Sequence, residues 1–253
     1  MAKIAFISAL GGQGCSLSAV YTARAAASAG HAVTLADLGG FGGTLACMLG
    51  VDDCVSMNLG DVASGQCLPE DALVDCGGGL RLLPSGRFSQ NTVSPLSVEV
   101  RRIIGELARE GDVFADLPAG TLPDCGMAGC FDVFVICALA DSVSLKYAAA
   151  LCRMIRKASS QTARPCGIRL LLTDFTPSRM KLGGIPDIDG CIDTVGARLI
   201  GVLPHDESAL SAALSGQPPD EKCELMRYAR DTAERIYGAR VPLDSPRSFR
   251  LRI

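Results

Sequence analysis

The chain has 253 residues and a formal net charge of -3, with 48% hydrophobic residues, 20% charged residues and 28 glycines. This composition excludes a disordered, fibrous or collagen-like chain, and the length predicts one large α/β domain over residues 1–253. The slight acidity provides no global basic field, so we predict no nucleic-acid partner.

Short apolar runs alternate along the chain with amphipathic stretches, a pattern typical of a doubly wound, mostly parallel sheet with helices on both faces. The predicted strands are Lys3–Ser8, Val33–Ala36, Leu80–Leu83, Val113–Asp116, Val133–Leu139, Gly167–Thr173 and Leu199–Leu203. The predicted helices are Ser16–Ala29, Ser97–Glu110, Ser142–Ala158, Glu207–Leu214 and Glu221–Tyr237. The segment Asp174–Gly196, rich in Gly, Pro and Asp, is expected to carry loops or short helices.

The first predicted strand runs into a glycine-rich turn that opens an alanine-rich helix. The turn and the start of this helix consist of Gly11, Gly12, Gln13, Gly14, Cys15, Ser16 and Leu17. Glycines let consecutive main-chain amides point inward, and the helix dipole adds partial positive charge at the same place. The turn is therefore suited to bind phosphate, although an ordinary glycine-rich βα turn has the same composition.

Two carboxylates follow other predicted strands at the edge of the sheet where this turn lies. Asp37 ends the second strand, and Asp116 ends the fourth, before Leu117-Pro118-Ala119-Gly120. A carboxylate at the end of a neighbouring strand can hold Mg²⁺ opposite a loop hydroxyl, here that of Ser16. We predict Ser16, Asp37 and Asp116 as the metal site; the alternative is that both aspartates are ordinary cap or turn residues.

Taken together, these motifs resemble the MinD/ParA family of deviant Walker A P-loop ATPases, whose loop has the pattern K-G-G-x-G-K-[ST]. The resemblance covers nearly the whole chain, and the block from Leu199 to Gly216 is similar to the MinD branch. It implies a P-loop NTPase fold of the SIMIBI type, a cofactor of ATP or ADP with Mg²⁺, and a homodimer. It also places the nucleotide at the loop residues above and its adenine near Thr176, Pro204 and Asp206.

The chain departs from the family pattern at residues that carry charge. The two lysines of the loop fall on Leu10 and Cys15, and the second aspartate, which orients the attacking water, falls on Gly39. An asparagine of MinD-like proteins falls on Thr176. Losing one charge-assisted contact weakens binding by roughly 10- to 150-fold, whereas phosphoryl transfer depends on every positioned cation. We therefore expect nucleotide binding to persist, hydrolysis to be weak or lost, and no residue to be assigned as catalytic.

The resemblance predicts a MinD/ParA-like positioning or scaffold protein for division-site or pilus/secretion machinery, with protein partners from that machinery. The loop, which lacks both lysines of the family pattern, resembles that of the atypical TadZ/CpaE pilus-assembly branch. Three alternatives remain open: an active MinD-type ATPase, a dimer that never uses nucleotide, and an NAD-binding Rossmann oxidoreductase. The last alternative rests on the glycines after the first strand, with Asp37 about twenty residues further on.

The remaining predictions concern the location of the protein and the chemistry of individual residues. The longest apolar run, residues 133–140, is shorter than the ~18 residues needed to span a bilayer, so we expect a cytoplasmic protein, peripheral to the membrane only through a partner. Two prolines interrupt the tail 242–253, which predicts no autonomous membrane anchor. Phe249, Leu251 and Ile253 are expected to lie against the chain's own domain; the alternative is that they add a strand to the edge of a partner's sheet. Cys15 is interpreted as a small packing residue or a low-pKa thiol, and His205 as a solvated partner of Asp206.

Overall fold

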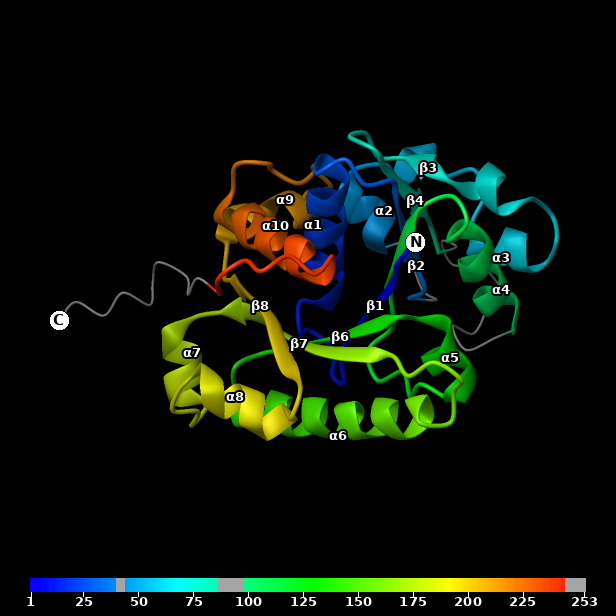
Figure 1. Ribbon diagram of the computed structural model, residues 1–253. Coiled ribbons are helices and arrows are strands. Elements are labelled where there is room, and N and C mark those ends of the chain that lie inside the picture. Colours follow the sequence, from blue (N-terminus) through cyan, green and yellow to red (C-terminus); the bar gives the residue numbers. More distant parts are fainter. Residues whose placement is uncertain (40–43, 86–97, 244–253) are drawn as a thin grey trace.

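The computed structural model describes residues 1–39, 44–85 and 98–243, and Figure 1 shows how they are arranged. In this part of the chain, eight strands form one sheet in the order β3-β4-β2-β5-β1-β6-β7-β8. β3 runs antiparallel to β4, and every other neighbouring pair is parallel. The strands are β1 (Lys3–Ile7), β2 (Val33–Asp37), β3 (Val74–Asp75), β4 (Leu80–Leu83), β5 (Asp112–Asp116), β6 (Val133–Ala138), β7 (Gly167–Phe175) and β8 (Arg198–Pro204).

Helices cover both faces of this sheet (Figure 1), which confirms the predicted architecture. One face carries α1 (Cys15–Ser28), α2 (Thr44–Leu49), α9 (Glu207–Leu214) and α10 (Glu224–Ile236). The other carries α3 (Leu59–Ala63), α4 (Val98–Leu107), α5 (Cys125–Cys130), α6 (Ser142–Ser159), α7 (Pro177–Leu182) and α8 (Ile188–Val195). Two short 3₁₀ turns, η1 (Asp52–Cys54) and η2 (Pro69–Ala72), lie between α2 and β3.

β1 shows why the centre of the sheet is rigid. Ile4 and Phe6 pack with α1 and α10 on one face, while Ala5 and Ile7 pack with α4 and α6 on the other. All four side chains are fully buried, and burying a large apolar side chain stabilises the fold by roughly 1.5–3 kcal/mol. The loop that follows β1 is therefore attached to a run of fully buried residues in the interior of the sheet.

The expectation of seven strands is wrong by one, because β3 was not predicted. β3 has only two residues and pairs antiparallel with β4. Arg24 of α1 holds this hairpin by donating to the carbonyl oxygens of Cys76 and Gly77, at 2.7 and 2.6 Å. Such a contact between distant segments leaves no trace in local sequence periodicity. The helices α2, α3 and α5 were also missed, since five or six residues do not establish a helical period.

The segment Asp174–Gly196 contains short helices, as expected: β7 continues to Phe175, and α7 and α8 follow. The predicted packing of Phe249, Leu251 and Ile253 concerns residues outside the described part of the chain. Among the described residues, no helix combines the length and apolar character needed to cross a membrane.

Candidate functional site

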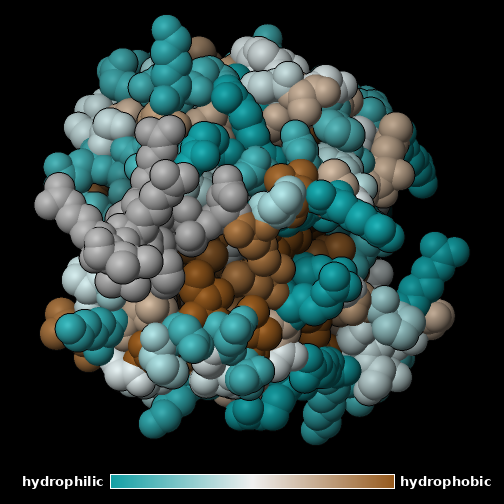
Figure 2. Space-filling view, turned by 60° about the vertical axis from the view of Figure 1, so that its left-hand side comes forward, coloured by the Kyte–Doolittle hydropathy of each residue, from teal (hydrophilic) through white to brown (hydrophobic). Residues whose placement is uncertain are grey.

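The ends of three neighbouring strands define the site. β5 lies between β1 and β2, and the strand register places Asp116 opposite Phe6 on one side and opposite Asp37 on the other. A cavity of about 490 Å³, within the usual range for ligand pockets, lies at this edge of the sheet. Figure 2, which brings forward the left-hand side of Figure 1, shows apolar atoms gathered in the middle of that face with hydrophilic atoms around them.

The glycine-rich turn forms one wall of the cavity. Gly12 and Gly14 have φ angles of +72° and +66°, a backbone conformation that side chains other than glycine rarely adopt. α1 then begins at Cys15 with neither a side-chain cap nor an acidic residue in its first turn. Within the described part of the chain, the main-chain amides of residues 14–17 donate no hydrogen bond. Free amides at a helix N-terminus are donors for an anion such as phosphate.

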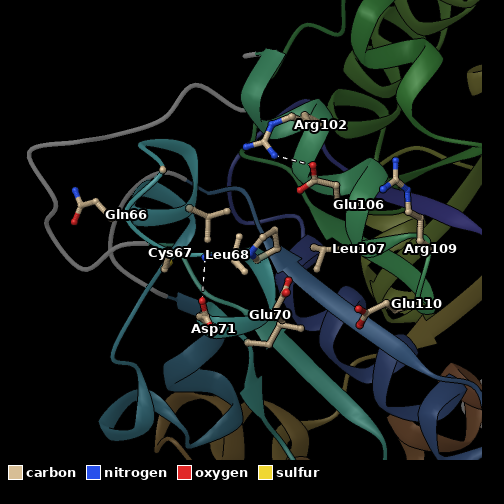
Figure 3. Close-up of a pocket in the computed structure, with 14 residues that line it drawn as sticks. Gln66, Cys67, Leu68, Glu70, Asp71, Arg102, Glu106, Leu107, Arg109 and Glu110 are labelled. Carbon is tan, nitrogen blue, oxygen red and sulfur yellow. Dashed lines mark hydrogen bonds and ion pairs between the residues drawn. The ribbon is translucent and has the colours of Figure 1, made fainter.

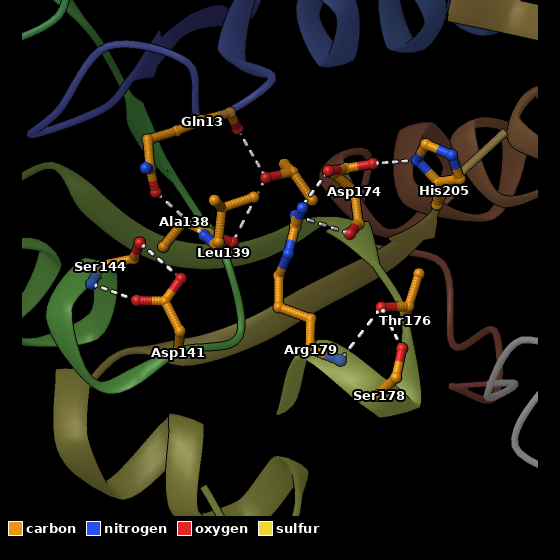
Figure 4. A network of polar contacts seen from close by, with 11 residues as sticks. Gln13, Ala138, Leu139, Asp141, Ser144, Asp174, Thr176, Ser178, Arg179 and His205 are labelled. Atoms are coloured by element: carbon orange, nitrogen blue, oxygen red, sulfur yellow. Dashed lines mark hydrogen bonds and ion pairs between the residues drawn. The ribbon is translucent and has the colours of Figure 1, made fainter. Parts of the chain in front are cut away.

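Gln13 and Thr173 fasten the turn to the sheet (Figure 4). The hydroxyl of Thr173 donates to the carbonyl oxygen of Gln13 at 2.6 Å and lies 3.3 Å from that of Ala138. The side-chain oxygen of Gln13 accepts from the amide of Leu139 at 3.0 Å. Both side chains are buried, so the turn is held to the ends of β6 and β7 by hydrogen bonds shielded from water.

Asp37 organises the segment after β2. One of its carboxylate oxygens accepts from the amide of Gly39 at 2.9 Å and the other from the amide of Leu45 at 3.3 Å. Burial raises the pKa of Asp37, and these two hydrogen bonds oppose that effect. Asp37 therefore supports the start of α2 as well as facing the cavity.

Asp116 is the unsatisfied group of the site. Its Oδ1 is buried and has no hydrogen-bond partner among the described residues. Burial raises the pKa of Asp116 to about 7; a hydrogen bond from Ser16 opposes this increase, and the charge of Asp37 adds to it. A bound cation would stabilise this buried carboxylate, because it would contact the unpaired oxygen and offset the repulsion from the second carboxylate.

The donor atoms of Ser16, Asp37 and Asp116 fit Mg²⁺, which takes oxygen ligands and binds through one or two carboxylates together with phosphate and water. Nowhere among the described residues do three or more His, Cys, Asp and Glu side chains gather as a metal site. The three predicted metal-site residues are brought to one cavity wall, where an ion would take its other ligands from a phosphate and from water.

The described residues that line the cavity include no lysine or arginine. Cys15 is buried, and its hydrogen bond with Cys137, followed by burial, raises the pKa of its thiol well above the ordinary value. This direction contradicts the low-pKa interpretation and favours simple packing. Leu10 is not part of the lining.

The rim of the cavity differs from the sequence-based expectation. His205 does not pair with Asp206: its Nδ1 lies 2.5 Å from a carboxylate oxygen of Asp174, whose other oxygen accepts from Arg179 at 2.5 Å (Figure 4). Asp206 instead caps α9 and accepts from the amide of Leu225 at 2.9 Å. Partial burial raises the pKa of Asp206, but its hydrogen bonds outweigh this effect and lower the pKa.

Most predicted nucleotide contacts lie in this one cavity. The lining includes Gly11, Gly12, Gln13, Gly14, Cys15, Ser16, Leu17, Pro204 and Asp206. Thr176 is not brought to the wall, because its hydroxyl caps α7 by accepting from the amide of Arg179. Thr173 and Asp174 also line the cavity and were not among the predicted site residues, although Thr173 ends a predicted strand and Asp174 follows it directly, where α/β folds place ligand contacts.

A second cavity, of about 690 Å³, lies between the segment around η2 and the end of α4 (Figure 3). Its lining mixes acidic and basic side chains, and Arg102 is already paired with Glu106 at 2.7 Å. This arrangement selects no particular ligand charge, so we assign the site to the first cavity.

Comparison with known proteins finds chains of similar sequence and fold. No protein-family model matches the chain. The septum site-determining protein MinD of Bacillus subtilis is 26% identical over 249 residues, which cover 95% of this chain and 90% of MinD. The MinC:MinD cell division protein complex of Aquifex aeolicus contains a chain with a TM-score of 0.82 at 22% identity, covering 97% of this chain and 99% of that one. MinD of Pyrococcus horikoshii complexed with Mg-ADP has a TM-score of 0.79 at 20% identity, over 93% and 95% of the two chains.

The sheet order, the glycine-rich turn after β1 and the paired strand-end aspartates define a P-loop NTPase fold. In the Rossmann order, the first two strands are neighbours, whereas here β5 separates β1 from β2, which argues against the NAD-binding alternative. The sequence match to MinD, at 26% identity, extends over nearly the whole chain, so the chain is similar along nearly its whole length to the MinD/ParA family of P-loop ATPases.

Proposed function

We propose that the chain binds ATP or ADP with Mg²⁺ in the cavity at the ends of β1, β2 and β5, and that it acts as a nucleotide-responsive positioning or scaffold protein. The observation that carries this proposal is Oδ1 of Asp116, which has no hydrogen-bond partner among residues 1–39, 44–85 and 98–243, together with the main-chain amides of residues 14–17, which donate to none of these residues either. A polyphosphate with a divalent cation supplies both missing partners. The amides would hold phosphate oxygens, and Ser16 with the two aspartates would hold the metal, which neutralises phosphate charge when bound.

We further propose that this chain hydrolyses ATP very slowly or not at all. No lysine or arginine of the described residues lines the cavity, and a buried thiol occupies the position where a charged amine would face the phosphates. Phosphoryl transfer is accelerated mainly by positioned positive charge, and a single catalytic arginine contributes about 10³–10⁵ in rate in related chemistry. Amides and one metal ion support binding without supplying that charge.

The test is titration of the purified chain with a fluorescent ATP analogue, with and without Mg²⁺, together with a phosphate-release assay. Wild type should bind only weakly without Mg²⁺, and Asp116→Asn should lose the Mg²⁺-dependent part of the affinity. Absence of any binding at millimolar nucleotide would contradict the proposal, and turnover of order 1 s⁻¹ or faster would contradict its hydrolytic part.

Cys15→Lys tests the charge argument directly. A lysine at this position should tighten Mg-nucleotide binding by roughly 10- to 150-fold, because a charge-assisted hydrogen bond contributes about 1.5–3 kcal/mol. Cys15→Ala is the matched control, since it removes the thiol without adding charge, and it should leave the affinity within about threefold of wild type. Equal gains for both variants would show that relief of packing, rather than charge, controls binding.

For partners, we propose protein components of division-site or pilus/secretion machinery, approached by a nucleotide-dependent homodimer. Support comes from the similarity to MinD, whose Aquifex form was solved in complex with MinC. Sedimentation with and without Mg-ATP tests the dimer: mass that is independent of nucleotide would favour the nucleotide-free alternative.

A further inference from the structure

The outer face of α6 carries an exposed apolar row. Val143, Tyr147, Ala150 and Met154 follow one another at the i, i+4, i+7, i+11 spacing that places residues on one side of a helix. Val143 is 59%, Tyr147 53% and Met154 39% exposed, and Ala150 is half-buried. The row extends over about 16 Å, or three helical turns. In Figure 1, α6 runs along the lower edge of the molecule, with one side against the sheet and the other facing outward.

A row of cations runs parallel to this apolar row. Lys146, Arg153 and Lys157 are exposed and lie about 70° round the helix from it, all on the same side. Their side chains form no hydrogen bond or ion pair with any described residue. From Ser142 to Ser159 the helix contains no acidic residue, and its N-cap Asp141 is occupied by the amide and hydroxyl of Ser144. The chain as a whole has a net charge of -3, so the positive charge on α6 is confined to this part of the surface.

The neighbouring elements leave this face uncovered. The apolar side chain of Leu182 in α7, 89% exposed, lies at the same end as Val143, because the carbonyl oxygen of Gly183 accepts from the amide of Ser142. α8 packs beside α6 and carries the exposed acids Asp189 and Asp193, but neither forms an ion pair with an α6 cation among the described residues.

The arrangement of apolar and basic side chains on α6 distinguishes an anionic membrane from an acidic partner helix as the surface that α6 would contact. A helix that lies on an anionic membrane presents a broad apolar face with cations toward the headgroups on its polar side. Here the cations flank only one side of a row one residue wide, and on the other side Leu151 and Ala158 are buried against the body of the protein. A narrow apolar row with one charged flank matches the packing surface of a second helix, as in coiled coils.

We propose that the outer face of α6 binds an amphipathic helix of a partner protein, about three turns long, whose apolar row is flanked by Asp or Glu. The apolar rows pack together, and the acidic flank meets Lys146, Arg153 and Lys157. This interaction surface is separate from the nucleotide cavity and does not depend on nucleotide binding, since none of its residues lines that cavity.

The probe is a labelled three-heptad peptide with Leu at the a and d positions and Glu at e and g, compared with the same peptide carrying Lys at e and g. Binding is followed by fluorescence anisotropy at physiological salt. The Glu peptide should bind wild type about tenfold more tightly than the Lys peptide. Tyr147→Glu should weaken binding of the Glu peptide by about tenfold. Leu68→Glu, which changes an apolar residue of comparable exposure outside α6, should leave that binding unchanged.

The triple variant Lys146→Glu, Arg153→Glu, Lys157→Glu should reverse the preference between the two peptides. Thermal unfolding by circular dichroism establishes that each variant is folded, independently of any nucleotide. Equal binding of both peptides, or no effect of the triple variant, would overturn the proposal. It is also overturned if the chain ignores both peptides but pellets with phosphatidylglycerol vesicles through these cations, or if Tyr147→Glu abolishes self-association instead, which would identify a second copy as the occupant.

Discussion

Asp116 combines burial, a neighbouring carboxylate and an oxygen without a hydrogen-bond partner among the described residues. In the absence of metal, its raised pKa means that the folded protein keeps a proton which the unfolded chain has already released. The free energy of unfolding should therefore fall as pH rises from 3.8 to about 7, by up to about 4 kcal/mol from this group alone. Above about pH 7 the carboxylate is ionised in the folded protein as well, and the unfolding free energy no longer changes with the titration of Asp116.

Denaturant unfolding of metal-free protein at pH 5, 6 and 7 measures this effect. Asp116→Asn should remove most of the decline between pH 5 and 7, while Asp193→Asn, at an exposed position of α8, should keep the wild-type slope. Added Mg²⁺ should stabilise wild type most at pH 7 and above, where the carboxylate is ionised, and should not stabilise Asp116→Asn. Identical slopes in all three proteins would show that Asp116 does not control the pH dependence.

Thr173 is the residue on which the position of the P-loop depends. Thr173→Val keeps the side-chain shape but removes the hydroxyl that donates to Gln13, leaving a buried carbonyl oxygen without its partner. We expect a loss of about 1–3 kcal/mol in unfolding free energy and weaker Mg-nucleotide binding, measured by denaturant titration and fluorescence. Thr194→Val removes a similar hydroxyl-to-carbonyl bond on exposed α8 and should cost less than about 0.5 kcal/mol without changing affinity. Equal effects of the two substitutions would argue against the positioning role.

At the scale of elements, the connection from α4 to β5 depends on one close backbone approach. A Cβ at Gly111 would lie 2.5 Å from the carbonyl oxygen of Ala32, an atom of the chain before β2 that cannot move without shifting the strand. Gly105, six residues earlier on the exposed side of α4, has nothing within 4 Å of the corresponding position. The same substitution should therefore have opposite effects at the two glycines.

Gly111→Ala should destabilise the protein by about 1–3 kcal/mol through overpacking. Gly105→Ala should stabilise it by about 0.5–1 kcal/mol, because alanine loses less backbone entropy in a helix than glycine does. Urea unfolding of both variants measures the two changes in unfolding free energy. A loss of stability in Gly105→Ala as large as that in Gly111→Ala would show that the helix does not tolerate any side chain there.

At the scale of the whole molecule, Asp112 joins segments that are far apart in the sequence. Its carboxylate accepts from the amide of Ala2 at 2.6 Å and from the hydroxyl of Tyr237 at 2.8 Å. The ring of Tyr237 in turn stacks on His31, with 3.8 Å between ring centroids. These contacts link the ends of α1 and α10 to the beginnings of β1 and β5, at the opposite end of the sheet from the cavity.

Tyr237→Phe should lower the unfolding free energy by about 1.5–3 kcal/mol, because the lost hydrogen bond has a charged acceptor. Tyr147→Phe, at an exposed tyrosine whose hydroxyl has no hydrogen-bond partner among the described residues, should stay within about 0.5 kcal/mol of wild type. Thermal and urea unfolding of both variants provide the comparison. No loss in Tyr237→Phe would mean that stacking on His31, rather than the hydrogen bond, holds α10 in place.

The sequence predicted the parallel strands, the longer helices and the cluster of Ser16, Asp37 and Asp116. Period-2 and period-3.6 patterns are local, and the carboxyl ends of neighbouring parallel strands necessarily meet at one edge. Those two facts are sufficient to bring the P-loop and the strand-end aspartates together without knowledge of the packing. The short elements β3, α2, α3 and α5 were missed because their formation depends on tertiary contacts, such as that of Arg24 with the β3–β4 hairpin.

By itself, the sequence determined the fold class, the position of the phosphate-binding turn and the absence of lysine from positions 10 and 15, since each follows from residue types and their spacing. Only the tertiary structure decided that Oδ1 of Asp116 lacks a partner among the described residues, that His205 meets Asp174 rather than Asp206, and that Thr176 caps α7 outside the cavity. Hydrogen-bond pairing and burial are properties of the three-dimensional neighbourhood, in which residues far apart in the chain compete for the same donor or acceptor.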